Sequence, residues 1–98
     1  MDYQVILSPC AVDDLRAIVR YVASDDPVAA ARLGEGLLSA TKRLATFPEL
    51  GRFVPEFTDP MIREIVVRPY RIVYRVDHPA RRVEVARFWH GARGNPEL

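Results

Sequence analysis

The chain has 98 residues, a net charge of +1 and a single cysteine, which excludes an internal disulfide. A chain of this length forms one modest core, so we treat residues 1–98 as a single domain. Its hydrophobic content of 49% excludes a disordered chain, and its near-neutral charge sets no overall requirement for a nucleic-acid partner. Because no basic leader opens the chain and no apolar run approaches about 20 residues, we expect a cytoplasmic protein without a membrane partner.

The first half of the chain reads as one strand and two helices. Residues Tyr3 to Leu7 alternate in polarity, which predicts a short strand. Ser8-Pro9 then supplies an N-cap and a proline at the first helical position, and helical spacing of apolar residues continues to near Ser24. Asp25-Asp26-Pro27 repeats this start signal, and the second helical pattern extends to about Ala45. Because so few residues join the two helices, we expect an antiparallel hairpin.

The second half of the chain reads as strands separated by turns. Segment Phe53–Phe57 is expected to be irregular or a poor strand because it contains Pro55. Strands are predicted at Ile62–Arg68, Tyr70–Val76 and Arg82–Trp89. The order β-α-α-β-β-β predicts an α+β domain, with the helical hairpin packed on one face of a small, mainly antiparallel sheet. The tail, residues 91–98, has no helix or strand pattern, and the sequence leaves open whether it is ordered or flexible.

The middle strand of the three places aromatic and aliphatic side chains on one face and Arg71 and Arg75 on the other. We expect the helices to cover the apolar face and the chemistry to lie on the arginine face. With Arg63 of the neighbouring strand, these residues form a predicted three-arginine patch that suits phosphate or carboxylate groups. Two alternatives stay open: a solvated face with ion pairs to Glu64 and Glu84, or a docking surface for an acidic partner segment.

His90 stands at the exit of the last strand, among Arg87, Trp89 and Arg93. A histidine in basic surroundings can act as a general acid or base, but we favour a strand-end histidine that binds a backbone carbonyl. An RNA-cleaving site would have to be built from Glu56, Arg63, Arg71, Arg75 and His90, with Glu56 or Glu64 as the base. Ion pairing or solvation is the more ordinary role for these carboxylates.

No cofactor or metal is expected. The two histidines and the cysteine lie far apart and have no ligand spacing. The sequence also lacks a glycine-rich phosphate loop and a nucleophile motif.

Short motifs follow one another along nearly the whole chain. They are Ser8–Leu15 with Ile18 and Tyr21, Pro27 with Ala29–Ala31, Leu44–Pro48 with Gly51-Arg52, Arg63-Glu64, Tyr70–Val76 and His90–Arg93. Together they resemble the ParE/RelE superfamily of toxins from bacterial type II toxin–antitoxin modules, and the ParE branch more than the RelE branch. The fold that this resemblance implies agrees with the pattern of predicted elements.

The resemblance implies different activities for the two branches. RelE-like members are ribosome-dependent mRNA endonucleases that use basic residues with a Glu, His or Tyr acid–base partner. ParE-like members are understood to block DNA gyrase. In both branches a cognate antitoxin wraps the toxin, forms hetero-oligomers with it and alone contacts operator DNA.

This chain departs from the nuclease pattern. Its only lysine is Lys42, and it has no tyrosine near the C-terminus. We therefore expect a gyrase-directed toxin that acts by binding and is neutralised by a ParD-like antitoxin. The alternatives are a RelE-like mRNA endonuclease and an attenuated toxin that serves as an antitoxin-binding corepressor.

The expected partner is an amphipathic segment that crosses the second helix and runs towards the arginine face. The predicted target- or antitoxin-binding residues are Arg32, Leu38, Arg63, Arg71, Arg75, Arg87, Trp89, His90 and Arg93.

Overall fold

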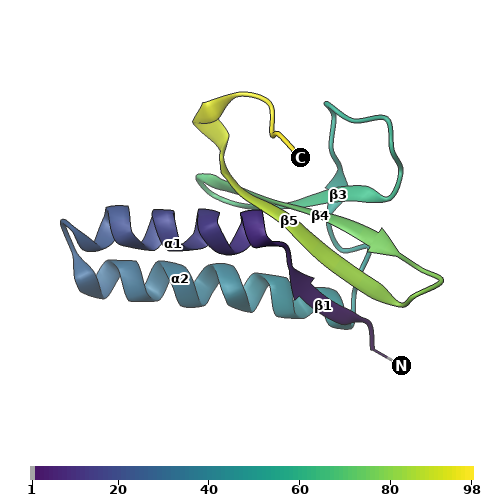
Figure 1. Cartoon of the computed structure of the whole chain (residues 1–98), viewed down its shortest axis with the longest axis horizontal. Coiled ribbons are helices and arrows are strands. Elements are labelled where there is room, and N and C mark those ends of the chain that lie inside the picture. Colours follow the sequence, from purple (N-terminus) through teal and green to yellow (C-terminus); the bar gives the residue numbers. More distant parts are fainter. Residues whose placement is uncertain (1) are drawn as a thin grey trace.

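The computed structural model describes residues 2–98, which form a helical hairpin packed on a five-stranded sheet (Figure 1). The elements are β1 (Gln4–Leu7), α1 (Pro9–Ala23), α2 (Pro27–Lys42) with a 3₁₀ turn (Arg43–Ala45), β2 (Arg52–Phe53), β3 (Ile62–Val67), β4 (Tyr70–Asp77), β5 (Arg82–His90) and a final 3₁₀ turn (Gly91–Arg93). The predicted α+β architecture is confirmed, and β2 is a two-residue strand at the start of the segment expected to be irregular or a poor strand. Within residues 2–98, neither helix has the length and apolar character needed to cross a bilayer.

The strands lie in the order β1-β5-β4-β3-β2. β1 runs parallel to β5, and every other neighbouring pair is antiparallel. The mainly antiparallel sheet is therefore confirmed.

The two helices begin where the capping signals predict. Ser8 Oγ accepts a hydrogen bond from the Ala11 N–H at 3.0 Å, and Asp26 Oδ1 accepts one from the Ala29 N–H at 3.1 Å. Each cap satisfies a backbone donor that has no partner within its helix. The short connection makes the helices antiparallel neighbours on one face of the sheet (Figure 1).

The main core lies between the helical hairpin and the sheet. Leu37 and Leu44 pack there against Ile72, Tyr74 and Phe88, which all come from β4 and β5. A second, smaller cluster joins Val54, Ile62 and Val73. Because Val54 belongs to the loop between β2 and β3, that loop covers part of the sheet face that we expected to be open.

The start of α1 continues the pairing of β1 along the edge of β5. The Ser8 N–H donates to the Val85 carbonyl, and Ser8 Oγ donates to the Ala86 carbonyl, each at 2.9 Å. Farther along, the Phe88 N–H donates to Asp14 Oδ2 at 3.1 Å. The register between β4 and β5 shifts in this region, after Val73. The helix therefore satisfies strand groups that β1 is too short to reach.

Gly51 lies against Glu64 of β3 and Tyr74 of β4, and it provides a test of the packing at that place. Its N–H donates to Tyr74 Oη at 2.8 Å, and a Cβ at this position would lie 2.7 Å from that oxygen and against the Glu64 carbonyl. We expect Gly51→Ala to lower the free energy of unfolding by about 1–3 kcal/mol, because the chain must move to admit the methyl group.

Gly36 is the matched control, since a Cβ there would have no atom within 4 Å and the residue lies inside α2. Gly36→Ala should raise the free energy of unfolding by about 0.5–1 kcal/mol. Urea unfolding measures both changes. Equal midpoints for Gly51→Ala and the parent chain would contradict the packing described here.

Candidate functional site

The candidate site is the arginine face, by which we mean the sheet face that points away from the helices. It carries Arg71 and Arg75 of β4, Glu64 of β3, and Arg87 and Trp89 of β5. The register pairs Arg71 with Trp89 and pairs Val73 with both Arg87 and Glu64, so these side chains share one face. The alternation predicted for the middle strand is confirmed, because its other side chains lie in the main core.

Arg63 does not belong to this face. It pairs with Tyr74, whose side chain lies in the main core, so Arg63 points to the helix side of the sheet. Its guanidinium donates to the Gly51 carbonyl at 2.8 Å and stacks 4.3 Å from the Phe53 ring centre. The predicted three-arginine patch is therefore wrong, because the pairing register puts Glu64, and not Arg63, beside Arg71.

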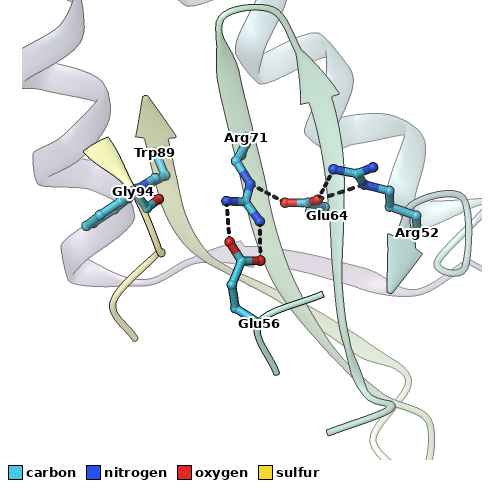
Figure 2. A network of polar contacts seen from close by, with 6 residues as sticks. All are labelled: Arg52, Glu56, Glu64, Arg71, Trp89 and Gly94. Carbon is cyan, nitrogen blue, oxygen red and sulfur yellow. Dashed lines mark hydrogen bonds and ion pairs between the residues drawn. The ribbon is translucent and has the colours of Figure 1, made fainter. Parts of the chain in front are cut away.

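A buried carboxylate lies at the centre of the arginine face (Figure 2). Glu64 is 1% exposed and receives a guanidinium on each side. Arg52 Nε donates to Oε2 at 2.7 Å, and Arg71 Nε donates to Oε1 at 2.5 Å. A buried carboxylate is tolerated only with such partners, so Glu64 fixes β2, β3 and β4 relative to one another.

Arg71 is also bound by a second carboxylate. Its two terminal nitrogens reach Glu56 in a bidentate pair, at 2.9 and 2.8 Å. The hydrogen bond to Glu56 is the main cause that raises the pKa of Arg71, and the same bond lowers the pKa of Glu56. The alternative of ion pairing on this face is thus correct for Arg71, whose guanidinium is engaged by two acids of its own chain.

The C-terminal segment lies over the arginine face at Trp89. The indole Nε1 donates to the Gly94 carbonyl at 3.1 Å (Figure 2), and Trp89 as a whole residue is 2% exposed. The guanidiniums of Arg87 and Arg93 lie 4.8 and 4.0 Å from its ring centre. The tail, in which we expected neither helix nor strand, begins with the short 3₁₀ turn and then packs on Trp89.

Arg87 connects β5 to the first helix. It forms a bidentate pair with Asp14, at 2.7 and 2.9 Å, and also donates to the Glu97 carbonyl at 2.8 Å. The pair with Asp14 is the main cause that raises the pKa of Arg87. Sequence reasoning missed this role of Asp14, because no local pattern connects residues that are 73 positions apart.

His90 lies away from the arginine face. It pairs with Tyr70, which belongs to the main core, and the two rings meet edge to face at 5.3 Å. Its Nδ1 accepts a hydrogen bond from the Ala92 N–H at 3.0 Å, which caps the final 3₁₀ turn. The predicted contact with a backbone carbonyl is therefore wrong, since the imidazole accepts a backbone N–H instead.

The residues considered for RNA cleavage do not converge. Glu56 and Arg71 form one ion pair, Arg75 is exposed farther along β4, and Arg63 and His90 lie on the helix side. Within residues 2–98, no three His, Cys, Asp or Glu side chains gather closely enough to hold a metal ion.

The two binding residues predicted on the second helix do not lie on the arginine face. Arg32 and Leu38 are both exposed on α2, which belongs to the layer on the far side of the sheet from the arginine face. A partner that touched both regions would have to pass around an edge of the sheet.

The lowered pKa of Glu56 predicts a pH dependence. Its value in the folded chain lies below the ordinary 4.5, so the unfolded chain binds the proton more readily in acid. The stability from the Glu56–Arg71 pair is complete above pH 4.5 and is lost as the pH falls through the folded-state pKa. We expect Glu56→Gln to flatten this acid-dependent loss, as measured by urea unfolding at a series of pH values. Glu35→Gln on exposed α2 is the control and should leave the profile unchanged.

Glu64→Gln tests the buried pair directly. The amide would bring N–H donors against a guanidinium, so we expect the free energy of unfolding to fall by about 2–4 kcal/mol. The control is Glu84→Gln, a half-buried position opposite Arg75. Similar urea midpoints for the two variants would show that Glu64 is not the central contact.

Comparison with known proteins places the chain in a family. It matches the family model described as "ParE toxin of type II toxin-antitoxin system, parDE" over residues 5–94. Toxin RelE2 of Caulobacter vibrioides is 37% identical over 90 residues, covering 92% of this chain and 97% of the relative. Toxin RelE1 of the same organism is 36% identical over 95 residues, covering 93% and 96%.

Two solved structures share the fold. One is the chromosomal ParDE system from P. aeruginosa, with a TM-score of 0.74, 20% identity and coverage of 90% of this chain and 95% of that chain. The other is the toxin–antitoxin complex RelBE2 from Mycobacterium tuberculosis, with a TM-score of 0.70, 20% identity and coverage of 92% and 99%. These structures support the fold alone, whereas the family model and the relatives support membership. The chain therefore belongs to the ParE/RelE family of type II toxin–antitoxin toxins.

Proposed function

We propose that this toxin acts by binding DNA gyrase in the cytoplasm and that a ParD-like antitoxin neutralises it in a hetero-oligomer. The observation that supports binding over catalysis is that the arginines at the centre of the arginine face are already ion-paired. Its central cations, Arg71 and Arg87, are engaged by carboxylates of their own chain. Operator DNA is contacted only through the antitoxin in this proposal.

RNA cleavage needs an acid, a base and a cation near one phosphate. Glu56 is a poor general base in this arrangement, because its bidentate pair with Arg71 lowers its pKa. His90 is separated from that pair by the sheet, since the two lie on opposite faces. A protein target has no such requirement, because it needs only a complementary surface.

The antitoxin partner is supported by the two structural neighbours, whose titles name a ParDE system and a RelBE2 complex. The match to the ParE family model supports the choice of gyrase as the target. The names of the two Caulobacter vibrioides relatives support the second candidate, a RelE-like mRNA endonuclease.

The deciding experiment is a gyrase supercoiling assay with the purified chain, with and without the protein encoded beside it. We expect inhibition at micromolar concentration that the neighbouring protein relieves. Arg75→Glu should weaken the inhibition by about tenfold or more, because Arg75 is exposed on the arginine face. Arg20→Glu on α1 reverses the same charge away from that face and is the matched control.

If the chain does not inhibit supercoiling, two other functions have to be distinguished. Ribosome-dependent cuts in transcripts after expression would establish the endonuclease, with His90→Ala as the first variant to examine. Normal growth on expression without the antitoxin, together with intact transcripts, would leave the corepressor role.

A further inference from the structure

Three side chains that the proposed function does not use form a row of polar contacts: a hydroxyl, an imidazole and a carboxylate. Tyr3 Oη lies 2.6 Å from His78 Nδ1, and His78 Nε2 lies 3.2 Å from Glu49 Oε1. Tyr3 precedes β1, His78 belongs to the loop between β4 and β5, and Glu49 belongs to the loop before β2. The fold therefore brings together three groups from distant parts of the chain.

The two neighbours of the imidazole decide where its proton lies. An ionised carboxylate only accepts hydrogen bonds, so Glu49 is matched by an N–H at Nε2. In the neutral imidazole Nδ1 then has a lone pair, and it accepts the hydrogen bond from the Tyr3 hydroxyl. This is the order of groups in a hydrolase triad: a hydroxyl, a base that takes its proton, and a carboxylate that orients the base.

An arginine stands at each end of this row. Arg63 Nη2 lies 3.8 Å from Glu49 Oε2, the carboxylate oxygen that does not face His78. At the other end the Arg81 guanidinium lies over the Tyr3 ring, 5.1 Å from its centre. Arg81 has a φ of 51°, in the left-handed region where glycine is usual. A cation at this place favours the negative charge that the phenol oxygen gains as it loses its proton.

The row is held in place and is open to solvent. The Tyr3 N–H donates to the Ala45 carbonyl at 2.8 Å, and the half-buried Tyr3 side chain packs against the main core. The side chains of His78 and Glu49 are 39% and 59% exposed. A small reagent can therefore approach the base and the carboxylate from outside.

A surface hollow of about 400 Å³ adjoins the row. Glu49 lines it together with Thr46 and three apolar residues, Phe47, Pro48 and Leu50. An apolar lining suits the hydrocarbon part of an ester and gives a phosphate or a sugar few partners. The hollow therefore favours an uncharged acyl or aryl group.

We propose that Tyr3 is an acyl-acceptor site, at which the hydroxyl takes an acyl group from an activated ester, with His78 as the base and Glu49 as a positioning residue. Tyr3 Oη forms a bond to the ester carbonyl carbon while His78 Nδ1 takes the phenol proton. The bond from that carbon to the leaving oxygen breaks, and this oxygen departs with the electron pair and then takes the proton from Nδ1. The products are an O-acyl tyrosine and a free alcohol or phenol.

The first test treats the purified Cys10→Ser chain with p-nitrophenyl acetate, because the exposed thiol of Cys10 would compete for the reagent. Peptide mass mapping measures the acetylation rate of each tyrosine, and hydroxylamine, which removes acetyl groups from tyrosine but not from amines, identifies the site. We expect Tyr3 to react at least about tenfold faster than Tyr21. Tyr21 is 81% exposed, and within residues 2–98 its hydroxyl contacts no imidazole. Exposure alone would give the opposite order.

The second test uses variants. His78→Asn keeps an acceptor but cannot take the phenol proton, so the Tyr3 rate should fall to about that of Tyr21. Glu49→Gln should lower the Tyr3 rate about threefold to tenfold, because a neutral amide no longer favours the imidazolium. Glu35→Gln on exposed α2 is the matched control and should leave the rate unchanged. The urea midpoint and the Tyr21 rate of each variant show whether the fold is kept.

The pH profile of the parent chain distinguishes a base from a structural contact. In acid, both nitrogens of His78 carry a proton, and Nδ1 can no longer take one from Tyr3. The ratio of the Tyr3 rate to the Tyr21 rate should therefore fall as the pH is lowered from about 8 to about 5. The titratable and charged groups around this imidazole are Tyr3 and Glu49, which contact it, and Arg63 and Arg81, which contact those two.

Each outcome decides the inference. Equal rates at Tyr3 and Tyr21 would overturn it and leave the bond between Tyr3 and His78 as a structural contact only. A ratio of the two rates that neither His78→Asn nor acid changes would also overturn it, because Tyr3 would then react without its base. None of these measurements involves gyrase or an antitoxin, so this inference and the proposed function stand or fall separately.

Discussion

The buried carboxylate of Glu64 is the contact on which the arrangement of the sheet depends. It accepts from Arg52 of β2 and Arg71 of β4, so three strands meet at one charge. Arg71 in turn holds Glu56 of the loop that covers Val73. Removing the carboxylate would leave Arg52 without a counter-charge and would break the side-chain links that tie β2 and β4 to β3. The same contact ends the pairing of β2 at Glu64 and leaves the rest of the β3 edge uncovered.

A second group of side-chain contacts joins separate elements on the other side of β4, where α1 meets β5. Asp14 accepts from Arg87 and from the Phe88 N–H, and Ser8 accepts and donates beside it. Ser8, the N-cap of α1, and Asp14 of α1 thus bond backbone groups of β5 that β1 is too short to pair. The charges of the arginine face are thus largely matched within the chain. That balance supports the proposal that this face binds a partner protein and does not cleave RNA.

The elements of the fold could be predicted because their signals are local. Ser8-Pro9 and Asp26-Pro27 carry their own capping chemistry, and the alternation of β4 follows from one strand alone. The face of Arg63 could not be predicted in this way, because it depends on the register between β3 and β4. A shift of one residue in that register would have put Arg63 beside Arg71.

The sequence predicted where the arginine face lies, but not which acids pair with its arginines. Arg71 and Arg75 share one face as predicted, and the register adds Arg87 and Trp89, which the sequence had not assigned to it. Their partners, however, come from distant segments: Glu56 from a loop, Asp14 from the first helix and Glu97 from the tail. Such long-range pairing has no signature in a single sequence. The role of His90 as a cap depends equally on the turn that follows it.

Trp89 has a consequence for how the molecule can be observed. It is the single tryptophan of the chain, and it contacts two guanidiniums and the C-terminal segment. The intrinsic fluorescence of the chain therefore comes mainly from one place, where the tail meets the arginine face. Any event that lifts Gly94 from the indole or brings water to the ring changes that emission. The fluorescence of Trp89 therefore reports whether the C-terminal segment is packed on the arginine face.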